Sequence, residues 1–283
     1  MAMPYKTILV HLNDRRRAGH LLKPAIALAA RWGAHLIGLH AYPSIPQLSA
    51  FGTRLGGEAV GSIVGAARQD SEHIHAVFER MTANQPFVAE WLEIKAMGAD
   101  IAELVMERGR AADLIVTSQA DPAWDLAPIL DFPERLAVES GRPVLVVPNE
   151  GHFDRIGRSV MVAWSGTRES ARAAFDALPL LTEADSVRVL GVAEPAAGGD
   201  GRNGLPDTAI TAALARHGVK VTALSSEPGN KSVTDEILSR LADVEGDLLV
   251  MGAYGHSRFR EFIFGGVTRH VARHMPVPTL FSH

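Results

Sequence analysis

The chain has 283 residues, of which 47% are hydrophobic and 21% are charged, and its formal net charge is -4. The length predicts two globular domains of ~100 to 150 residues each, and the charge offers no basic surface that would attract nucleic acid. The absence of cysteine excludes disulfides and cysteine-ligated zinc, and the absence of a leader or of an apolar run of ~20 residues predicts a cytoplasmic protein without a membrane partner.

Hydrophobic runs alternate with amphipathic segments along the first half of the chain. We predict strands and helices in turn, near Thr7 to Leu12, His20 to Trp32, His35 to Ala41, Ser71 to Thr82, Phe87 to Ile94, Asp100 to Gly109 and Asp113 to Thr117. This alternation is typical of a parallel sheet with helices on both faces. Stretches rich in Gly and Pro, Pro43 to Gly65 and Pro195 to Pro206, are expected to be loops, either variable surface connections or a functional lid.

The second half of the chain repeats the pattern of the first. Residues 112–116 (Ala-Asp-Leu-Ile-Val) correspond to residues 246–250 (Gly-Asp-Leu-Leu-Val), about 134 residues further on. Arg135 to Val147 likewise corresponds to Arg269 to Phe281, and both halves open on short β-branched runs. We therefore predict two copies of one α/β domain, over residues 1–148 and 158–283, with a linker at residues 149–157.

A glycine-rich loop follows the predicted strand Asp247 to Met251. It runs from Gly252 to Thr268, and Gly252, Gly255 and Gly265 are separated by two and by nine residues. Ligands of parallel α/β sheets collect at the carboxyl ends of the strands, where this loop is expected to lie. Glycines let the backbone approach a phosphate, and the free N–H groups at the start of the next helix favour an anion. Glycines also occur in ordinary turns, so the glycine pairs alone are compatible with both interpretations.

The full glycine spacing resembles the nucleotide loop of the ATP-binding branch of the universal stress protein family. Val160 to Ala174 looks like the first strand and helix of that family, and Pro276 to Phe281 looks like its last strand. The resemblance implies a tandem universal stress protein with two doubly wound parallel-sheet domains of the adenine nucleotide alpha hydrolase-like fold. It also implies a cytoplasmic stress-response module that binds ATP, optionally with Mg²⁺, in its second domain.

By the same resemblance, eight residues of the second half contact the ribose, the phosphates or the adenine: Ser165, Met251, Gly252, Gly255, Gly265, Gly266, Val267 and Thr268. Two of these positions depart from the family pattern. Gly266 stands where a Ser or Thr hydroxyl usually donates to phosphate, a role in which Thr268 is a partial substitute. Ser165 stands where an acid usually contacts adenine, and a neutral hydroxyl accepts more weakly than a carboxylate.

The first half lacks the glycines of this loop, because the corresponding residues are Ser118, Asp121, Asp131 and Phe132. The carboxylates of Asp121, Asp125 and Asp131 would place negative charge where phosphates would lie, which disfavours an anion. We therefore expect a single nucleotide site per chain. Asn13 and Asp14, at the end of the first strand, are interpreted as turn or N-cap residues.

Other charged and histidine motifs carry weaker predictions. His270 and His274 have a spacing that suits a metal, but no third ligand can be identified, and we interpret them as surface residues and predict no metal site. His40 is expected to pack or to border a loop. The run Arg15 to Arg17 is interpreted as surface charge at a helix start and not as a nucleic-acid contact.

No motif of the sequence identifies a catalytic site, so we expect at most slow ATP hydrolysis. Three functions stay open: an ATP-binding regulatory module, a scaffold of the same fold without nucleotide, and an ATP hydrolase or adenylyl transferase. The apolar last strands, Pro143 to Val147 and Pro278 to Phe281, can pair with each other as an internal pseudo-dimer. A further homodimer and a protein partner that the sequence does not name also stay open.

Overall fold

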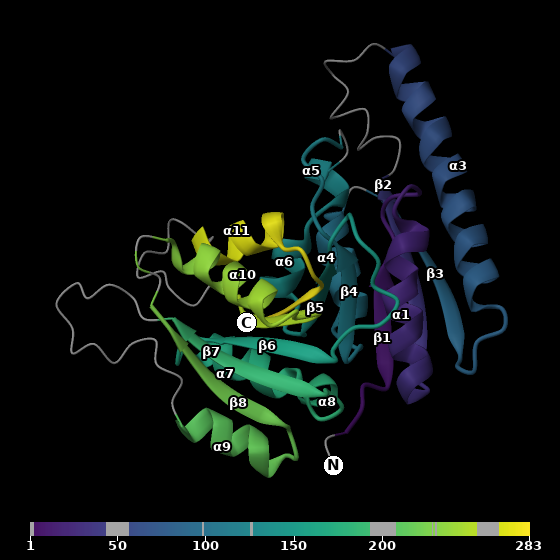
Figure 1. The fold of residues 1–283 in the computed structure, drawn as a ribbon. Coiled ribbons are helices and arrows are strands. Elements are labelled where there is room, and N and C mark those ends of the chain that lie inside the picture. The colour runs from purple at the N-terminus through teal and green to yellow at the C-terminus, as the bar shows by residue number, and fades with distance from the viewer. Residues whose placement is uncertain are drawn as a thin grey trace.

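The computed structural model describes residues 3–43, 57–97, 99–124, 127–192, 208–227, 229, 231–253 and 266–283. Its strands are β1 (Thr7–His11), β2 (His35–Pro43), β3 (Ala89–Ala96), β4 (Leu114–Ser118), β5 (Val144–Val147), β6 (Ser159–Trp164), β7 (Ser186–Val192), β8 (Val221–Ser226), β9 (Leu248–Gly252) and β10 (Thr279–Ser282). They form one sheet in the order β3-β2-β1-β4-β5-β10-β9-β6-β7-β8 (Figure 1).

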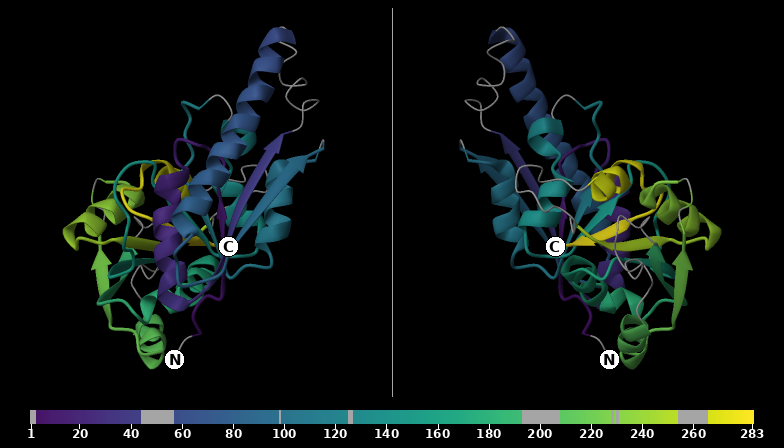
Figure 2. Two further views of the ribbon diagram at one scale, coloured as in Figure 1. Left: turned by 90° about the vertical axis from the view of Figure 1, so that its right-hand side faces the viewer. Right: turned by 90° about the vertical axis from the view of Figure 1, so that its left-hand side faces the viewer.

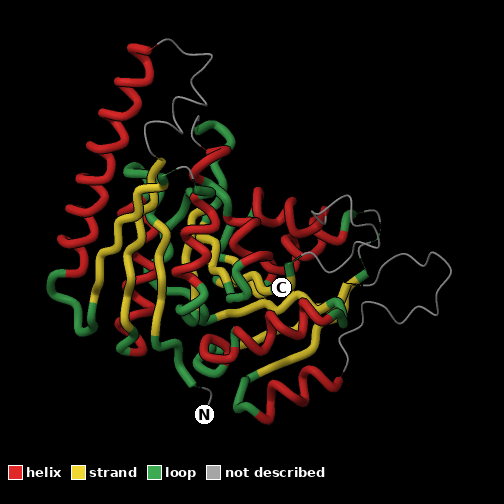
Figure 3. Tube along the Cα trace, turned by 180° about the vertical axis from the view of Figure 1, so that it is seen from behind, coloured by secondary structure: helices red, strands yellow, loops and turns green. Residues whose placement is uncertain are grey.

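The helices of the described chain are α1 (Ala18–Trp32), α3 (Gly57–Thr82), α4 (Ile101–Gly109), α5 (Ala127–Leu130), α6 (Pro133–Glu139), α7 (Arg168–Asp176), α8 (Leu178–Leu181), α9 (Thr208–Arg216), α10 (Val233–Asp243) and α11 (Gly266–His274). They cover both faces of the sheet, as Figures 2 and 3 show. One core packs α1, α3, α7, α8 and α9 against one face, and a second core packs α4, α6, α10 and α11 against the other. The predicted doubly wound α/β fold is confirmed.

The two halves have the same strand topology. The order is β3-β2-β1-β4-β5 in the first half and β8-β7-β6-β9-β10 in the second, and all pairings within a half are parallel. The halves meet through the antiparallel pairing of their last strands, in which Leu280 lies opposite Leu145 and Phe281 opposite Val144. These four side chains are buried, so the ladder continues through the middle of the molecule. This is the internal pairing that the apolar last strands suggested.

The repeated aspartates of the two halves have equivalent positions. Asp113 accepts hydrogen bonds from the main-chain N–H groups of Lys6 (2.7 Å) and Thr7 (2.9 Å). Asp247 accepts from the N–H groups of Arg158 (2.9 Å) and Ser159 (3.0 Å). Each carboxylate therefore ties the first strand of its half to the fourth, which gives a physical reason for the repeat in the sequence.

The structure corrects one predicted loop. Residues from Gly57 onward belong to α3, so the last part of the stretch Pro43 to Gly65 is helical. The glycines of residues 57–65 obscured an apolar pattern at Ala59, Val60, Ile63 and Val64 that continues into the rest of the helix. Figure 1 shows α3 reaching well beyond the ends of β2 and β3. The other predicted loop, Pro195 to Pro206, lies outside the described residues.

The predicted linker, residues 149–157, contains no helix or strand. Another contact joins the halves, since the Tyr5 hydroxyl donates to the carbonyl of Asp176 over 2.6 Å. Arg31 of the first half holds the linker, because it donates to the carbonyl of Ile156 over 3.0 Å. Within the described ranges, none of the helices has the length and apolar character needed to cross a membrane.

Candidate functional site

The candidate nucleotide site lies at the carboxyl ends of β6 and β9. These strands are neighbours in the sheet, and Ala163 pairs with Met251 near the end of both. From β6 the chain passes to β7 and β8 on one side and then returns to β9 on the other. The ends of β6 and β9 therefore flank the switch point of the second half, where open α/β sheets bind ligands.

The structure places the predicted residues in two groups. Ser165 and Thr167 follow β6, and their hydroxyl oxygens lie 3.1 Å apart, while Met251 is buried at the end of β9. Gly266, Val267 and Thr268 open helix α11 after the loop, with Val267 exposed and Thr268 buried. Gly252 ends β9, and Gly255 and Gly265 lie outside the described residues.

Gly252 lies directly against the start of helix α7. A Cβ added to this glycine would lie 2.6 Å from the main-chain carbonyl carbon of Glu169 and 2.6 Å from the nitrogen of Ser170. Because both atoms are backbone, a side chain at this position would require the helix to move. Gly252 is therefore needed for helix packing whether or not a phosphate approaches it.

Glu169 is a carboxylate at this edge that the sequence analysis missed. It is buried beside Gly252, in the first turn of α7, and it forms an ion pair with the exposed Arg168. Burial acts to raise the pKa of Glu169, but the hydrogen bonds and the charge of Arg168 outweigh it, and the pKa lies below its usual value. The second half thus retains a buried anionic group four residues after Ser165. An acid in the first turn of a predicted helix is the signal that would have indicated it.

The corresponding edge of the first half is filled by its own side chains. Asp131, whose side chain is fully buried, accepts from the main-chain N–H of Asp121 over 2.7 Å and lies 3.3 Å from the guanidinium of Arg17. Arg17 also stacks over Trp124, with 5.2 Å between its guanidinium carbon and the ring centroid. The interpretation of Arg15 to Arg17 as surface charge is wrong for Arg17, whose side chain is only 9% exposed, because distant loop residues cover it.

Asn13 and Asp14, both predicted as turn or N-cap residues, have different roles in the structure. Asp14 accepts from the main-chain N–H of Arg16 over 2.9 Å, as expected of a turn residue, and it also pairs with the Arg16 side chain. Asn13 instead joins the buried cluster, since its amide donates to the carbonyl of Leu130 over 2.7 Å. The role of Asn13 depends on a residue 117 positions away, and no local pattern indicated it.

His11 is fully buried at the end of β1. Neither of its ring nitrogens has a hydrogen-bond partner, and the ring stacks on Phe132 with 5.0 Å between centroids. Burial, followed by the charges of His40 and Arg17, lowers the pKa of His11 to about 3. The side chain is therefore a neutral packing residue at ordinary pH.

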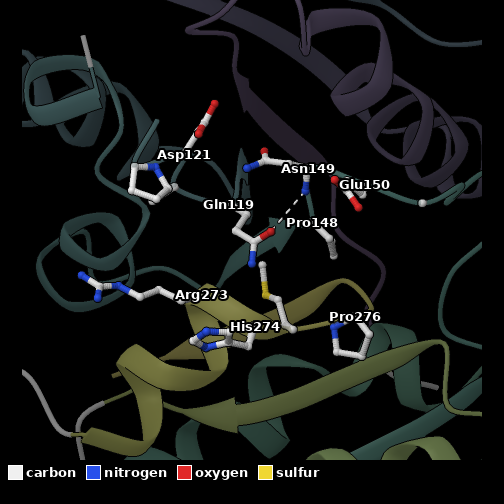
Figure 4. Close-up of a pocket in the computed structure, with 12 residues that line it drawn as sticks. Gln119, Asp121, Pro148, Asn149, Glu150, Arg273, His274 and Pro276 are labelled. Atoms are coloured by element: carbon white, nitrogen blue, oxygen red, sulfur yellow. Dashed lines mark hydrogen bonds between the residues drawn. The ribbon is translucent and has the colours of Figure 1, made fainter. Parts of the chain in front are cut away.

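A cavity of about 650 Å³ lies between the two halves, and none of the predicted site residues that the structure describes lines it. Gln119 and Asp121 line it from the first half, Glu150 lines it from the linker, and Arg273 and His274 line it from the end of α11 (Figure 4). The figure shows Gln119 extending from the first half toward the residues of α11. Its lining carries charges of both signs, and no sequence pattern indicates the cavity, because its walls come from distant parts of the chain.

The two histidines of α11 lie on one side of the helix. The ring centroids of His270 and His274 are 4.2 Å apart, and Nδ1 of His274 lies 2.9 Å from the carbonyl oxygen of His270. Among the described residues, no group of three or more His, Cys, Asp or Glu is arranged to hold a metal ion.

Comparison with known proteins finds a family model that matches the second half. Residues 157–283 match the family model of the universal stress protein family, and no curated protein matches the chain. A solved universal stress protein from Archaeoglobus fulgidus is similar over 98% of this chain and 95% of its own, with 14% identity and a TM-score of 0.66. A functionally unknown protein from Pseudomonas aeruginosa is similar over 99% of this chain and 93% of its own, with 13% identity and a TM-score of 0.60. At these identities the likeness establishes the fold.

Proposed function

Because the second half of the chain carries a domain of the universal stress protein family, we propose that this half binds an adenine nucleotide, with ATP as the leading candidate, and serves as a regulatory module. The observation that carries the proposal is the position of the glycine loop. It leaves β9 at Gly252, beside the end of β6, and leads into α11 at Gly266. This is the switch point at which parallel α/β sheets receive ligands.

The start of α11 supplies the chemistry for the phosphates. The first N–H groups of a helix have no partner within it, and the helix dipole favours negative charge at this end. In the proposed complex, the backbone of Gly265, Gly266 and Val267 would hold the phosphates, and Ser165 would contact the adenine. Met251, Gly252, Gly255 and Thr268 complete the proposed set. Mg²⁺ would accompany the phosphates, and no catalytic step is assigned.

Direct binding measurements test the proposal. Isothermal titration of the purified chain with ATP, ADP, AMP and cAMP, each with and without Mg²⁺, should give one site per chain. Mass spectrometry of small molecules released on denaturation would identify a nucleotide that the protein retains. A melting temperature unchanged by millimolar ATP would contradict the proposal, since a ligand specific for the folded state must raise it. That outcome would favour a scaffold of the same fold.

Two gain-of-function variants sharpen this test. Ser165→Asp restores an acid at the end of β6, and Gly266→Ser restores a hydroxyl at the start of α11. A hydrogen bond that involves a charged group contributes ~1.5 to 3 kcal/mol, so each variant should tighten ATP binding about tenfold. Ser225→Asp is the matched control, because it adds the same charge to an exposed position of the edge strand β8. If Ser165→Asp and Ser225→Asp change the affinity for ATP equally, the effect of Ser165→Asp comes from the added charge in general and not from a contact with the adenine.

A further inference from the structure

The buried cluster around Asp131 has the composition of an oxyanion site. The carboxylate of Asp131 receives the main-chain N–H of Asp121 (2.7 Å), the side-chain amide of Asn13 (3.2 Å) and both terminal nitrogens of Arg17 (3.3 and 3.4 Å). A guanidinium, a main-chain amide and a side-chain amide that converge on one point are the donors with which proteins bind phosphates and carboxylates. In this half the anion that they bind belongs to the chain itself.

The anchors of Arg17 do not depend on Asp131. Its guanidinium donates to the carbonyl of Gln119 (2.9 Å) and to the side-chain oxygen of Asn149 (3.1 Å), and its Nε lies 3.2 Å from the carboxylate of Asp14. These contacts, together with the stacking on Trp124, hold the guanidinium in place from several sides. The donor group is therefore preorganised, and removal of the carboxylate would leave an empty position and not a collapsed one.

The charges of the intact cluster disfavour the binding of a second anion. Among the described residues, two guanidinium groups, Arg16 and Arg17, face three carboxylates, Asp14, Asp121 and Asp131. The cluster is already one negative charge in excess, so a further anion would be repelled. Without Asp131 the remaining charges balance, and the donors that bound its carboxylate become unsatisfied in a buried place.

We propose that the first half contains an oxyanion site that the Asp131 carboxylate occupies as a tethered ligand, and that a free phosphate or carboxylate takes the site when that side chain is removed. The position of Asp131 corresponds in sequence to Gly265 of the second half, which has no side chain. The first half is thus held in a ligand-bound arrangement by its own chain. This inference does not depend on nucleotide binding by the second half.

The test uses the full chain with Asp131→Gly, a change that removes a fragment equivalent to acetate. The variant should melt at a lower temperature than the wild type. Sodium acetate and sodium phosphate should restore its melting temperature in a saturable way, relative to sodium chloride of equal ionic strength. In ¹⁵N spectra the amide of Asp121, which donates to Asp131, should shift with the same half-saturation. In the wild-type protein, acetate and phosphate should neither raise the melting temperature relative to chloride nor shift the amide of Asp121.

Two further variants keep the proposal falsifiable. Asp121→Asn removes one negative charge from the same cluster without vacating the donors, so it should show no rescue by acetate or phosphate. Asp131→Asn fills the position with a neutral group and should lower the melting temperature more than Asp121→Asn does. The proposal is overturned if acetate and phosphate stabilise the wild type and Asp131→Gly equally. It is also overturned if Asp131→Asn and Asp121→Asn have the same melting temperature, a comparison that remains available if Asp131→Gly does not fold.

Discussion

The side-chain amide of Gln119 donates a hydrogen bond to the main-chain carbonyl of Ala272 over 3.0 Å, and this bond joins the two halves of the chain. Its amide oxygen accepts from the main-chain N–H of Asn149 over 3.3 Å, so both ends of the amide are used. Ala272 lies near the end of α11, the helix that begins at the proposed phosphate loop. Gln119 therefore fixes the far end of that helix against the first half.

We predict that Gln119→Ala lowers the free energy of unfolding by ~1 to 3 kcal/mol, because it leaves the buried carbonyl of Ala272 and the partly buried N–H of Asn149 without their partner. Gln85→Ala is the matched control: its amide donates to the carbonyl of Met81 within one half, at a partly buried position. Gln85→Ala should lower the free energy of unfolding by less than Gln119→Ala does. Urea unfolding followed by circular dichroism compares the two variants. Equal losses of unfolding free energy would mean that the hydrogen bonds of Gln119 between the halves stabilise the protein no more than a bond within one half.

A second prediction concerns Gly252. Gly252→Ala should cost ~1 to 3 kcal/mol of stability, since its Cβ would lie within 2.6 Å of the backbone of α7. Gly19→Ala is the control, because its Cβ would meet no atom closer than 3.9 Å and the helix would gain up to ~1 kcal/mol in propensity. Thermal and urea unfolding measure both. If Gly252→Ala is as stable as the wild type, α7 is free to shift and the packing argument fails.

A third prediction follows from the buried imidazole of His11. Its pKa is lowered to about 3 in the folded state, whereas an unfolded histidine titrates near 6.5. The unfolded state therefore binds the proton first, so this group's contribution to stability is present above pH ~6.5 and is lost as the pH falls toward 3. Between pH 7 and pH 5 the loss amounts to about 2 kcal/mol.

His11→Leu removes both unpartnered nitrogens and should flatten the dependence of the unfolding free energy on pH in this range. Some acid sensitivity will remain, because burial lowers the pKa of His40 as well. His217→Leu, at an exposed position, is the control for the loss of a histidine as such. An unchanged slope in His11→Leu would show that this imidazole does not govern the acid response.

The sequence predicted the fold because the relevant signals are local. Strands and helices alternate along the chain, and Asp113 and Asp247 recur because each ties two strands of its half together. The sequence also shows Asp131 as a carboxylate in place of a loop glycine. From the sequence we predict that the negative charge of this carboxylate disfavours an external anion. The structure adds that the carboxylate itself occupies the position of the anion.

The features that were missed depend on distant residues. Arg17 follows two exposed arginines and looks solvated, but it is buried by Asp131, 114 residues away. The family resemblance puts Gly252 beside the ribose and phosphates, yet its immediate neighbour is the backbone of α7, which no sequence pattern indicates. The roles of Gly255 and Gly265 remain predictions from the sequence.

A last prediction concerns the joint between the two halves. In the whole chain β10 is covered by β5, and Leu280 and Phe281 are buried in the middle of the sheet. A fragment of residues 149–283 would expose β10 as an apolar edge strand with free N–H and C=O groups. Because β10 already pairs antiparallel with its counterpart β5, two fragments can pair through β10 in the same way, and we expect a two-fold dimer. Sedimentation velocity should show that dimer, and replacement of Leu280 by Lys should dissociate it. A folded, monomeric fragment would mean that β5 is not needed to cover this edge.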